Sequence, residues 1–301
     1  MPLPTADNLR GRTLSLVGTC KNAGKTTVLN ALLRQLYASD DKFCPVLTGV
    51  GRDGESVDVV TGTDKPRIFV REGTLVMTAE QLLSLCDCSM ELLLSTDIRT
   101  PLGEVYIFRA RSAGFVQVAG PSVVAQIARR KPTLLSLGDC LLVDGAAGRR
   151  SLGAASLADD VILCVGAGAS RSMEACVEEA VFLAELMTLP LLSPEEEAEA
   201  LAISGAVTDR TAEELLRRGN ALKGRILVAE DSSCFLLSPA LYGKLSRLGA
   251  VWRLRHRSRL LGLAVNPVSP GGWRFDAASF AAALAERSGL PVWNVKEGQE
   301  F

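Results

Sequence analysis

Residues 12–36, RTLSLVGTCKNAGKTTVLNALLRQL, constrain the fold of this chain more than any other stretch of it. The apolar run at 14–17 predicts a buried strand, and apolar residues at helical spacing predict a helix over about 25–37. A turn that carries glycine and lysine, 18–27 (GTCKNAGKTT), lies between them. Backbone N–H groups, a helix N-terminus and a lysine together attract a polyphosphate. The stretch therefore predicts a phosphate-binding loop, and a chance glycine–lysine turn is the alternative.

The residue types in this turn suggest how it would hold a nucleotide. Backbone N–H groups from about 22–27 would surround the phosphates, Lys25 would reach the β and γ oxygens as a catalytic cation, and Thr26 would offer its hydroxyl to Mg²⁺. The generic spacing G-x-x-x-x-G-K-[ST] is not met strictly, because Thr19 stands at its first position and Gly18 precedes it. Lys21 is equally compatible with an ordinary surface position. The predicted nucleotide-binding residues of the turn are Gly18, Thr19, Lys21, Asn22, Ala23, Gly24, Lys25, Thr26 and Thr27.

A bound Mg²⁺ needs carboxylates opposite the phosphate-binding turn, and two aspartates follow predicted strands. Asp144 closes the apolar run CLLVD, and Asp53 follows the strand predicted at 43–49. The carboxylate of Asp144 lies beside the turn if the two strands are neighbours in the sheet. We therefore predict Thr26, Asp53 and Asp144 as metal ligands, with Asp53 also a catalytic residue that orients water. For both aspartates the alternative is an ordinary turn position.

Strand-like runs alternate with helical ones for most of the length, which predicts an α/β fold with a largely parallel sheet. The run 77–86, MTAEQLLSLC, predicts a helix with Thr78 as its N-cap. Residues 99–103, RTPLG, predict a turn. The alternating run 104–120 predicts an antiparallel hairpin with Gly114 near its tip.

The polar, acidic stretch at 193–200, SPEEEAEA, divides the chain into two predicted parts. It is compatible with a linker and with the capped first turns of a helix. We predict a nucleotide-binding domain at 1–192 and a C-terminal α/β domain at 193–301. The alternative is that the C-terminal strands continue the first sheet.

The composition argues against several classes of protein. A formal net charge of −1 and 5% aromatic residues argue against a nucleic-acid partner, whose binding needs basic surfaces and stacking platforms. No apolar run reaches the roughly 18 residues that a transmembrane helix needs, and residues 1–12 lack the apolar core of a signal peptide. We therefore expect a cytoplasmic protein without a membrane partner. The eight cysteines form no CxxC pair and the single histidine, His256, stands in a basic run, so no local zinc site is predicted.

Several segments resemble those of one family in the same order along the chain. GTCKNAGKTT, PVLTG at 45–49, VDGAAG at 143–148 and LAVNPVSP at 263–270 resemble segments of dethiobiotin synthetase and the cobyrinic acid amidating enzymes. The resemblance implies a P-loop NTPase of the SIMIBI class, with a three-layer α/β/α arrangement, ATP and Mg²⁺. It also implies that Asn266 contacts the nucleotide base, whereas a turn cap before Pro267 is the alternative. Cys44 stands where that family has a substrate-binding lysine, which puts its carboxylating chemistry in doubt.

A second resemblance covers more of the chain. CKNAGKTT, DIRTPLGE, VAGPS, GAVTD and NPVSPGG followed by PVWNV resemble the nucleotide-binding subunits that reactivate cobalamin-dependent lysine 5,6-aminomutase and ornithine aminomutase. This implies an ATPase that couples hydrolysis to cofactor exchange in a partner aminomutase, and it is compatible with a homodimer. One alternative is a ligase or kinase that acts on a small metabolite. Another is a nucleotide-gated metallochaperone that uses Cys86 and Cys88. No guanine-reading N-K-x-D motif is present, which favours ATP over GTP.

Overall fold

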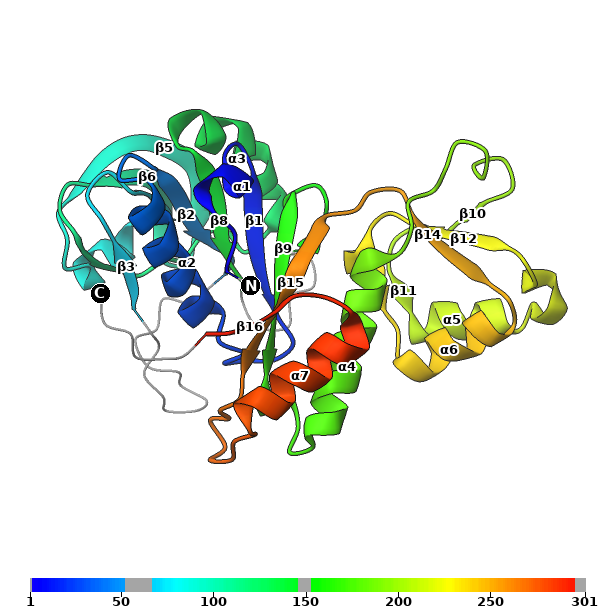
Figure 1. Cartoon of the computed structure of the whole chain (residues 1–301). Helices are drawn as coiled ribbons and strands as arrows, with labels where there is room; N and C mark the ends of the chain where they lie inside the picture. The colour runs from blue at the N-terminus through cyan, green and yellow to red at the C-terminus, as the bar shows by residue number, and fades with distance from the viewer. Residues whose placement is uncertain (1, 52–66, 146–152, 296–301) are drawn as a thin grey trace.

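The computed structural model describes residues 2–51, 67–145 and 153–295 and shows two unequal lobes (Figure 1). In these residues, nine strands form the central sheet of the larger lobe, in the order β16-β15-β9-β1-β8-β2-β4-β6-β5. The strands are β1 (Thr13–Gly18), β2 (Pro45–Gly49), β4 (Leu75–Ala79), β5 (Met90–Thr100), β6 (Gly103–Ala110), β8 (Cys140–Asp144), β9 (Asp160–Gly166), β15 (Arg259–Asn266) and β16 (Val292–Asn294). From β16 to β4 every pairing is parallel, and β6 pairs antiparallel with β4 and β5. The predicted α/β fold with a largely parallel sheet is confirmed.

Helices cover both faces of this sheet because its central strands are apolar on both sides. Leu141 and Val143 of β8 belong to one hydrophobic core, whereas Cys140 and Leu142 belong to the other. Helices α3, α4 and α7 pack on the first core, and α1 and α2 pack on the second. Their bounds are α1 (Ala6–Leu9), α2 (Lys25–Ser39), α3 (Val124–Leu137), α4 (Met173–Thr188) and α7 (Ala277–Ser288). The carboxyl ends of the parallel strands therefore meet at one edge of the sheet.

The structure corrects two of the local predictions. Residues 75–79 form strand β4, and only Glu80–Leu85 form a short 3-10 helix, so the helix predicted at 77–86 is wrong. Thr78 is fully buried in the strand, where its hydroxyl accepts the backbone N–H of Ala119 at 3.0 Å instead of capping a helix. Burial in the sheet has overridden the helical spacing of the sequence.

The predicted hairpin at 104–120 is also wrong. Strand β6 pairs with β4 and β5, whereas β7 (Gly114–Val116) pairs antiparallel with β3 (Ile68–Val70), so that Gly114 begins a strand. The hairpin of this region is β5–β6, and its turn lies within 99–103, where Thr100 pairs with Gly103. The predicted turn is therefore confirmed, although the strands that it joins are different from those expected.

The smaller lobe lies between α4 and β15 in the sequence (Figure 1). It holds a parallel sheet in the order β10-β12-β14 and the two-stranded pair β11–β13. Its elements are β10 (Leu201–Ala202), β11 (Val207–Thr208), α5 (Asp209–Leu216), a 3-10 turn at Gly219–Leu222, β12 (Ile226–Ala229), a 3-10 turn at Ser232–Cys234, β13 (Phe235–Leu236), α6 (Pro239–Arg247) and β14 (Val251–Leu254). An aromatic cluster forms its core, with the ring centroids of Phe235 and Trp252 5.0 Å apart.

The chain leaves the large sheet for the smaller lobe and then returns to it. After β14 in the smaller lobe, β15 pairs in parallel with β9, and β16 pairs with β15. The predicted boundary at 192/193 thus falls close to the start of the smaller lobe. For residues 259–294, however, the alternative of a continued first sheet describes the structure.

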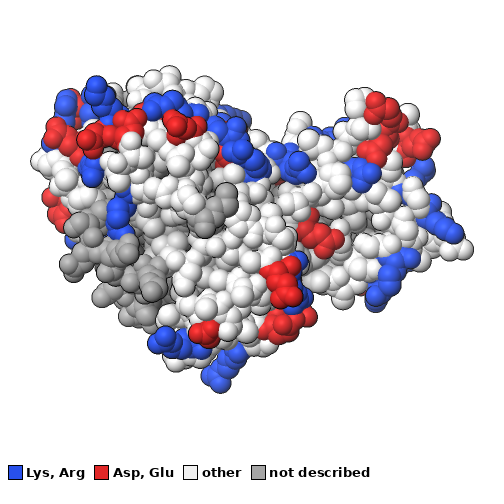
Figure 2. All heavy atoms as spheres, in the orientation of Figure 1, with Lys and Arg blue, Asp and Glu red and all other residues white. Residues whose placement is uncertain are grey.

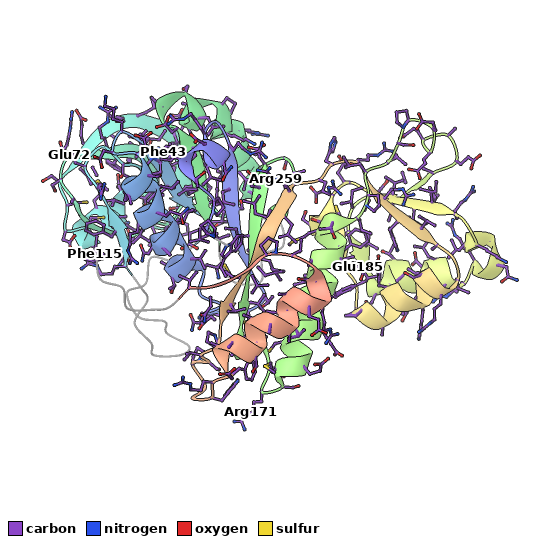
Figure 3. All side chains as sticks on the ribbon, in the orientation of Figure 1. Phe43, Glu72, Phe115, Arg171, Glu185 and Arg259 are labelled. Atoms are coloured by element: carbon purple, nitrogen blue, oxygen red, sulfur yellow. The ribbon has the colours of Figure 1, made fainter. Side chains whose placement is uncertain are left out.

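Helix α4 joins the two lobes. Its Val177 and Leu183 belong to a core of the large lobe, whereas Phe182 and Leu186 belong to the core of the smaller lobe. Glu185 of α4 lies on the side toward the smaller lobe (Figure 3), where burial and this carboxylate raise the pKa of Tyr242. A helix with apolar residues on two sides can hold two cores together.

The acidic stretch at 193–200 forms turns and no α-helix. Glu196 accepts hydrogen bonds from Nε and Nη2 of Arg253, and both carboxylate oxygens of Glu197 accept from Nη1 of Arg255. The acidic stretch thus pairs with arginines of the basic run that contains His256. On the face shown in Figure 2, acidic and basic side chains are interspersed and neither sign covers it.

His256 and the helices bear on the metal and membrane roles that the sequence argues against. His256 is exposed, and its Nε2 lies 3.4 Å from Oε1 of Glu230. None of the helices that the described residues form combines the length and the hydrophobicity that a bilayer crossing requires.

Candidate functional site

The predicted phosphate-binding turn lies at the carboxyl edge of the large sheet, over its central strands. Strand β1 is buried at every residue, and it runs between β9 and β8. The turn then leads directly into α2, whose apolar side packs on the second core. Gly24 occupies the N-cap position with φ of +87°, a left-handed value that disfavours a side chain. As a glycine, this N-cap offers no side chain to the first N–H groups of α2, and such groups at a helix N-terminus can bind an anion.

Lys25 folds back over the turn toward the end of β1. Only 9% of Lys25 is exposed, although it is the first residue of α2. A Cβ atom at Gly18 would lie 3.1 Å from the Lys25 Nζ atom. Glycine at position 18 therefore leaves room for the ammonium group. This explains why a glycine is needed one residue before the position that the generic spacing gives.

Thr26 and Asp144 meet at the same edge. The Thr26 hydroxyl donates a hydrogen bond to Oδ2 of Asp144 at 3.1 Å. This proximity arises because β8 lies between β1 and β2, with Asp144 opposite Leu16 on one side and opposite Gly49 on the other. A hydroxyl and a carboxylate are oxygen ligands of the kind that Mg²⁺ prefers. The two predicted metal ligands that the structure describes thus lie together.

Asp53, the third predicted metal ligand and second catalytic residue, lies outside the described residues. The same holds for 146–148, the end of the VDGAAG segment. Among residues 2–51, 67–145 and 153–295, no group of three histidine, cysteine or acidic side chains could hold a metal ion. Thr26 and Asp144 are therefore the two predicted metal ligands that the described residues contain.

The first half of the turn is attached to β9. The Thr19 N–H donates to the carbonyl of Cys164 at 3.0 Å, and its hydroxyl accepts the N–H of Gly166 at 3.3 Å. Thr19 therefore supports the base of the turn with both groups. Ala23 is buried, whereas Lys21 is exposed at the turn.

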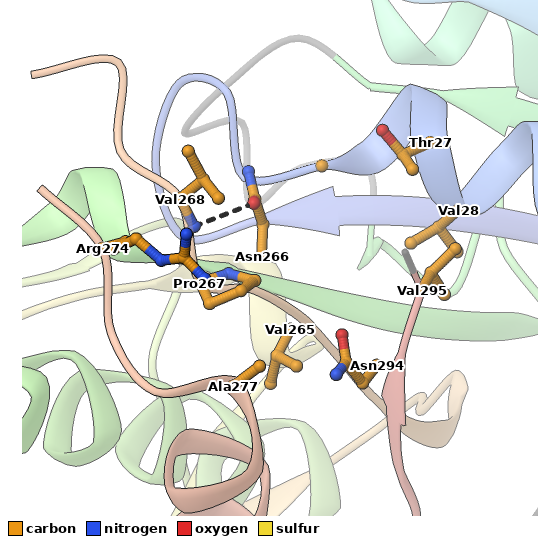
Figure 4. Close-up of a pocket in the computed structure, with 11 residues that line it drawn as sticks. Thr27, Val28, Val265, Asn266, Pro267, Val268, Arg274, Ala277, Asn294 and Val295 are labelled. Carbon is orange, nitrogen blue, oxygen red and sulfur yellow. Dashed lines mark hydrogen bonds between the residues drawn. The ribbon is translucent and has the colours of Figure 1, made fainter. Parts of the chain in front are cut away.

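A cavity of about 300 Å³ opens beside the turn (Figure 4). Its volume is at the lower end of the range for small-ligand sites. It lies between the start of α2, the ends of β15 and β16, and the start of α7. The side chains that line it and bear on its chemistry are those of Thr27, Val28, Val265, Arg274, Ala277 and Asn294.

Asn266 borders this cavity but uses its amide elsewhere. Its Nδ2 donates to the carbonyl of Asn22 at 2.8 Å, and its Oδ1 accepts the N–H of Val268 at 3.2 Å. The second bond is the turn cap that the sequence offers as the alternative to a base contact.

Sequence reasoning missed Asn294 and Arg274. Both line the cavity, and Asn294 is the last residue of β16. The rule that ligands bind outside the carboxyl ends of parallel strands could have pointed to Asn294. It did not suffice because the position of β16 in the large sheet was unknown.

The thiols of Cys86 and Cys88 each contact a different neighbour. The Cys86 thiol donates to the carbonyl of Leu82 at 3.4 Å, and the Cys88 sulfur lies 3.9 Å from that of Met90. Burial raises the pKa of both thiols, which disfavours the thiolate that a metal requires. The metallochaperone alternative stays a prediction.

The buried cysteines provide a test of the core around the site. Burial raises the pKa of Cys164, on β9 behind the turn, to about 12. The thiolate is the reactive form, so we expect no alkylation of Cys164 at pH 8, and labelling only near pH 12 or in denaturant. Mass spectrometry of iodoacetamide-treated protein measures this, with the half-buried Cys234 as internal comparison. Labelling of Cys164 in the folded chain at pH 8 would contradict the structure.

No model of a protein family matches this chain, and neither does any curated protein.

Proposed function

We propose that this chain is a P-loop protein of the SIMIBI class that binds and hydrolyses ATP with Mg²⁺. The observation that carries the proposal is the contact between Thr26 and Asp144, at 3.1 Å, next to the buried Lys25. A cation, a hydroxyl, a carboxylate and the N-terminus of α2 converge there, and phosphoryl transfer uses groups of these kinds. The cavity beside the turn adds room for a nucleoside.

Each group has a distinct role in this proposal. The N–H groups of about 22–27 bind the phosphate oxygens, and the Lys25 ammonium binds the β and γ oxygens, where charge develops during transfer. Thr27 lines the cavity and would contact the α-phosphate. Thr26 and Asp144 hold Mg²⁺, which when bound neutralises phosphate charge. Asp53 remains the predicted residue that orients water.

The cavity would receive the base, with Asn294 as the residue that recognises it. An amide offers a donor and an acceptor together, which matches the edge of adenine. The Arg274 guanidinium, which also lines the cavity, would stack on the face of the base. The apolar walls from Val265 and Ala277 fit a flat, weakly polar ring.

We expect Asn294→Ala to weaken ATP binding by about tenfold while leaving inorganic tripolyphosphate binding unchanged. The loss corresponds to one or two hydrogen bonds to the base. Isothermal titration with both ligands measures it. Asn220→Ala, in the smaller lobe, is the matched control because Asn220 is exposed and does not line the cavity. An unchanged ATP affinity in Asn294→Ala would show that the base does not bind beside Asn294 in this cavity.

We further propose that hydrolysis performs work on a partner enzyme, with a cobalamin-dependent aminomutase as the candidate that the sequence suggests. No described residue of the smaller lobe lines the cavity, because that lobe packs along α4. In this proposal the smaller lobe contacts the partner enzyme.

Steady-state ADP release tests the proposal. The basal rate should be low and should rise when a cobalamin-dependent aminomutase with damaged cofactor is added. Diamines, amino acids and corrinoids alone should have no effect. A rate that depends on one of these metabolites, with its phosphorylation or ligation, would instead establish the ligase or kinase. Absence of any Mg²⁺-dependent ATP binding would refute the function as a whole.

A further inference from the structure

Asn266 connects three parts of the proposed site through one side chain. It is the last residue of β15, and in the register of the sheet it lies opposite Gly166, the last residue of β9. Its amide nitrogen donates to the carbonyl of Asn22 in the turn, at 2.8 Å. Its amide oxygen accepts from the N–H of Val268, at 3.2 Å, as the dashed line in Figure 4 shows. Both ends of the amide are therefore engaged by backbone groups.

The partner of this amide is a strained part of the turn. Asn22 has φ of +59° and Gly24 has φ of +87°, so that two of three consecutive residues adopt left-handed conformations. Such values are uncommon for a residue with a side chain and persist when surrounding contacts hold them. The hydrogen bond from Asn266 holds the Asn22 carbonyl, and thereby the direction of the peptide that follows it.

Packing adds to the hydrogen bond. A Cβ atom at Gly24 would lie 3.1 Å from the Cβ atom of Asn266, so that the stem of Asn266 lies directly against the Gly24 backbone. The N–H groups that would bind phosphate run from Asn22 through this glycine into α2. Their orientation therefore depends on the contact with Asn266.

The other end of the amide leads to the cavity. The Val268 N–H follows Pro267, and Val268 pairs with Arg274 through an antiparallel bridge. Pro267, Val268 and Arg274 all line the cavity. A displacement of this segment would change the hydrogen bond that orients Asn266. Figure 4 shows that Asn266 points toward the turn, whereas Asn294 lies on the other side of the cavity.

We infer that Asn266 is a positioning residue, which holds the phosphate-binding turn in its binding conformation and links it to the wall of the cavity. It does not read the base, which is the role of Asn294. The inference rests on the proposed function, because it assigns a role in phosphate binding. It predicts that loss of Asn266 affects phosphate binding even when no base is present.

The test compares ATP with inorganic tripolyphosphate, which has the phosphates but no base. We expect Asn266→Ala to weaken both ligands by the same factor, about tenfold, because one hydrogen bond and its packing are lost. Asn266→Asp keeps the shape and the acceptor for Val268 but cannot donate to Asn22, so it should weaken both ligands at least as much. Asn294→Ala is the matched comparison and should weaken ATP alone. If Asn266→Ala weakens ATP but leaves tripolyphosphate unchanged, Asn266 reads the base and the inference is overturned.

Hydrogen exchange without ligand separates this inference from the proposed function. We expect the amide of Val28, which donates to the Gly24 carbonyl at 3.0 Å, to exchange faster in both Asn266 variants than in the wild type, and at the wild-type rate in Asn294→Ala. Equal exchange in all four proteins would overturn the positioning role. A wild type that binds neither ATP nor tripolyphosphate would refute the proposed function, and the exchange rates would still decide whether Asn266 holds the turn.

Discussion

Lys25→Ala should abolish nucleotide-dependent behaviour, with a loss of at least about 2 kcal/mol in binding or in transition-state stabilisation, or roughly 30-fold. Lys25 is buried although it carries a charge, and its ammonium lies beside Gly18 at the end of β1. Without it, the β- and γ-phosphates lose the one side-chain cation that the proposal places directly on their oxygens. Isothermal titration with ATP and steady-state ADP release measure the two effects.

The control for Lys25 is Lys21→Ala. It removes the same charge from the same turn, but Lys21 is exposed. We expect its effect to stay well below that of Lys25→Ala and to fade at high salt, as for an exposed charge. If Lys25→Ala retains wild-type affinity and turnover, the turn does not bind phosphate and the proposed function fails.

Asp144→Asn should be the second most damaging substitution. Asparagine can still accept the hydrogen bond from Thr26, which is 3.1 Å long in the wild type. It lacks the charge that holds a divalent cation. We expect the ATP turnover rate to fall at least roughly 30-fold, which corresponds to a loss of about 2 kcal/mol in transition-state stabilisation. The Mg²⁺ concentration that gives the half-maximal rate should rise. A Mg²⁺ titration of the turnover rate separates this change from a folding defect.

Asp41→Asn serves as the matched control because its side chain is 94% exposed and pairs only with Arg71 among the salt bridges of the described residues. Its Mg²⁺ dependence should equal that of the wild type. The same Mg²⁺ dependence in Asp144→Asn would show that Asp144 is no metal ligand. Asp53 would then be the acidic residue to test next.

Local sequence patterns predicted the strands and the helix next to the turn. In each strand the apolar residues form one short run, and in the helix they recur at helical spacing. The runs at 14–17 and 140–144 are buried strands, as predicted, and the helix after the turn begins at Lys25, as predicted. The pattern failed at 77–86, where a strand and a 3-10 helix together imitate a helical spacing. It failed again at 104–120, because alternation predicts a strand but does not select its partner.

The sequence by itself determined the turn between β1 and α2, because a short turn depends on neighbouring residues and on their backbone conformations. Only the tertiary structure decided what surrounds it. Thr26 meets Asp144 across 118 residues, and Asn266 meets Asn22 across 244 residues. The chain also passes through the whole smaller lobe before β15 and β16 bring Asn266 and Asn294 to the cavity. Such contacts depend on the order of strands in the sheet, which the packing of the complete chain selects and no local period encodes.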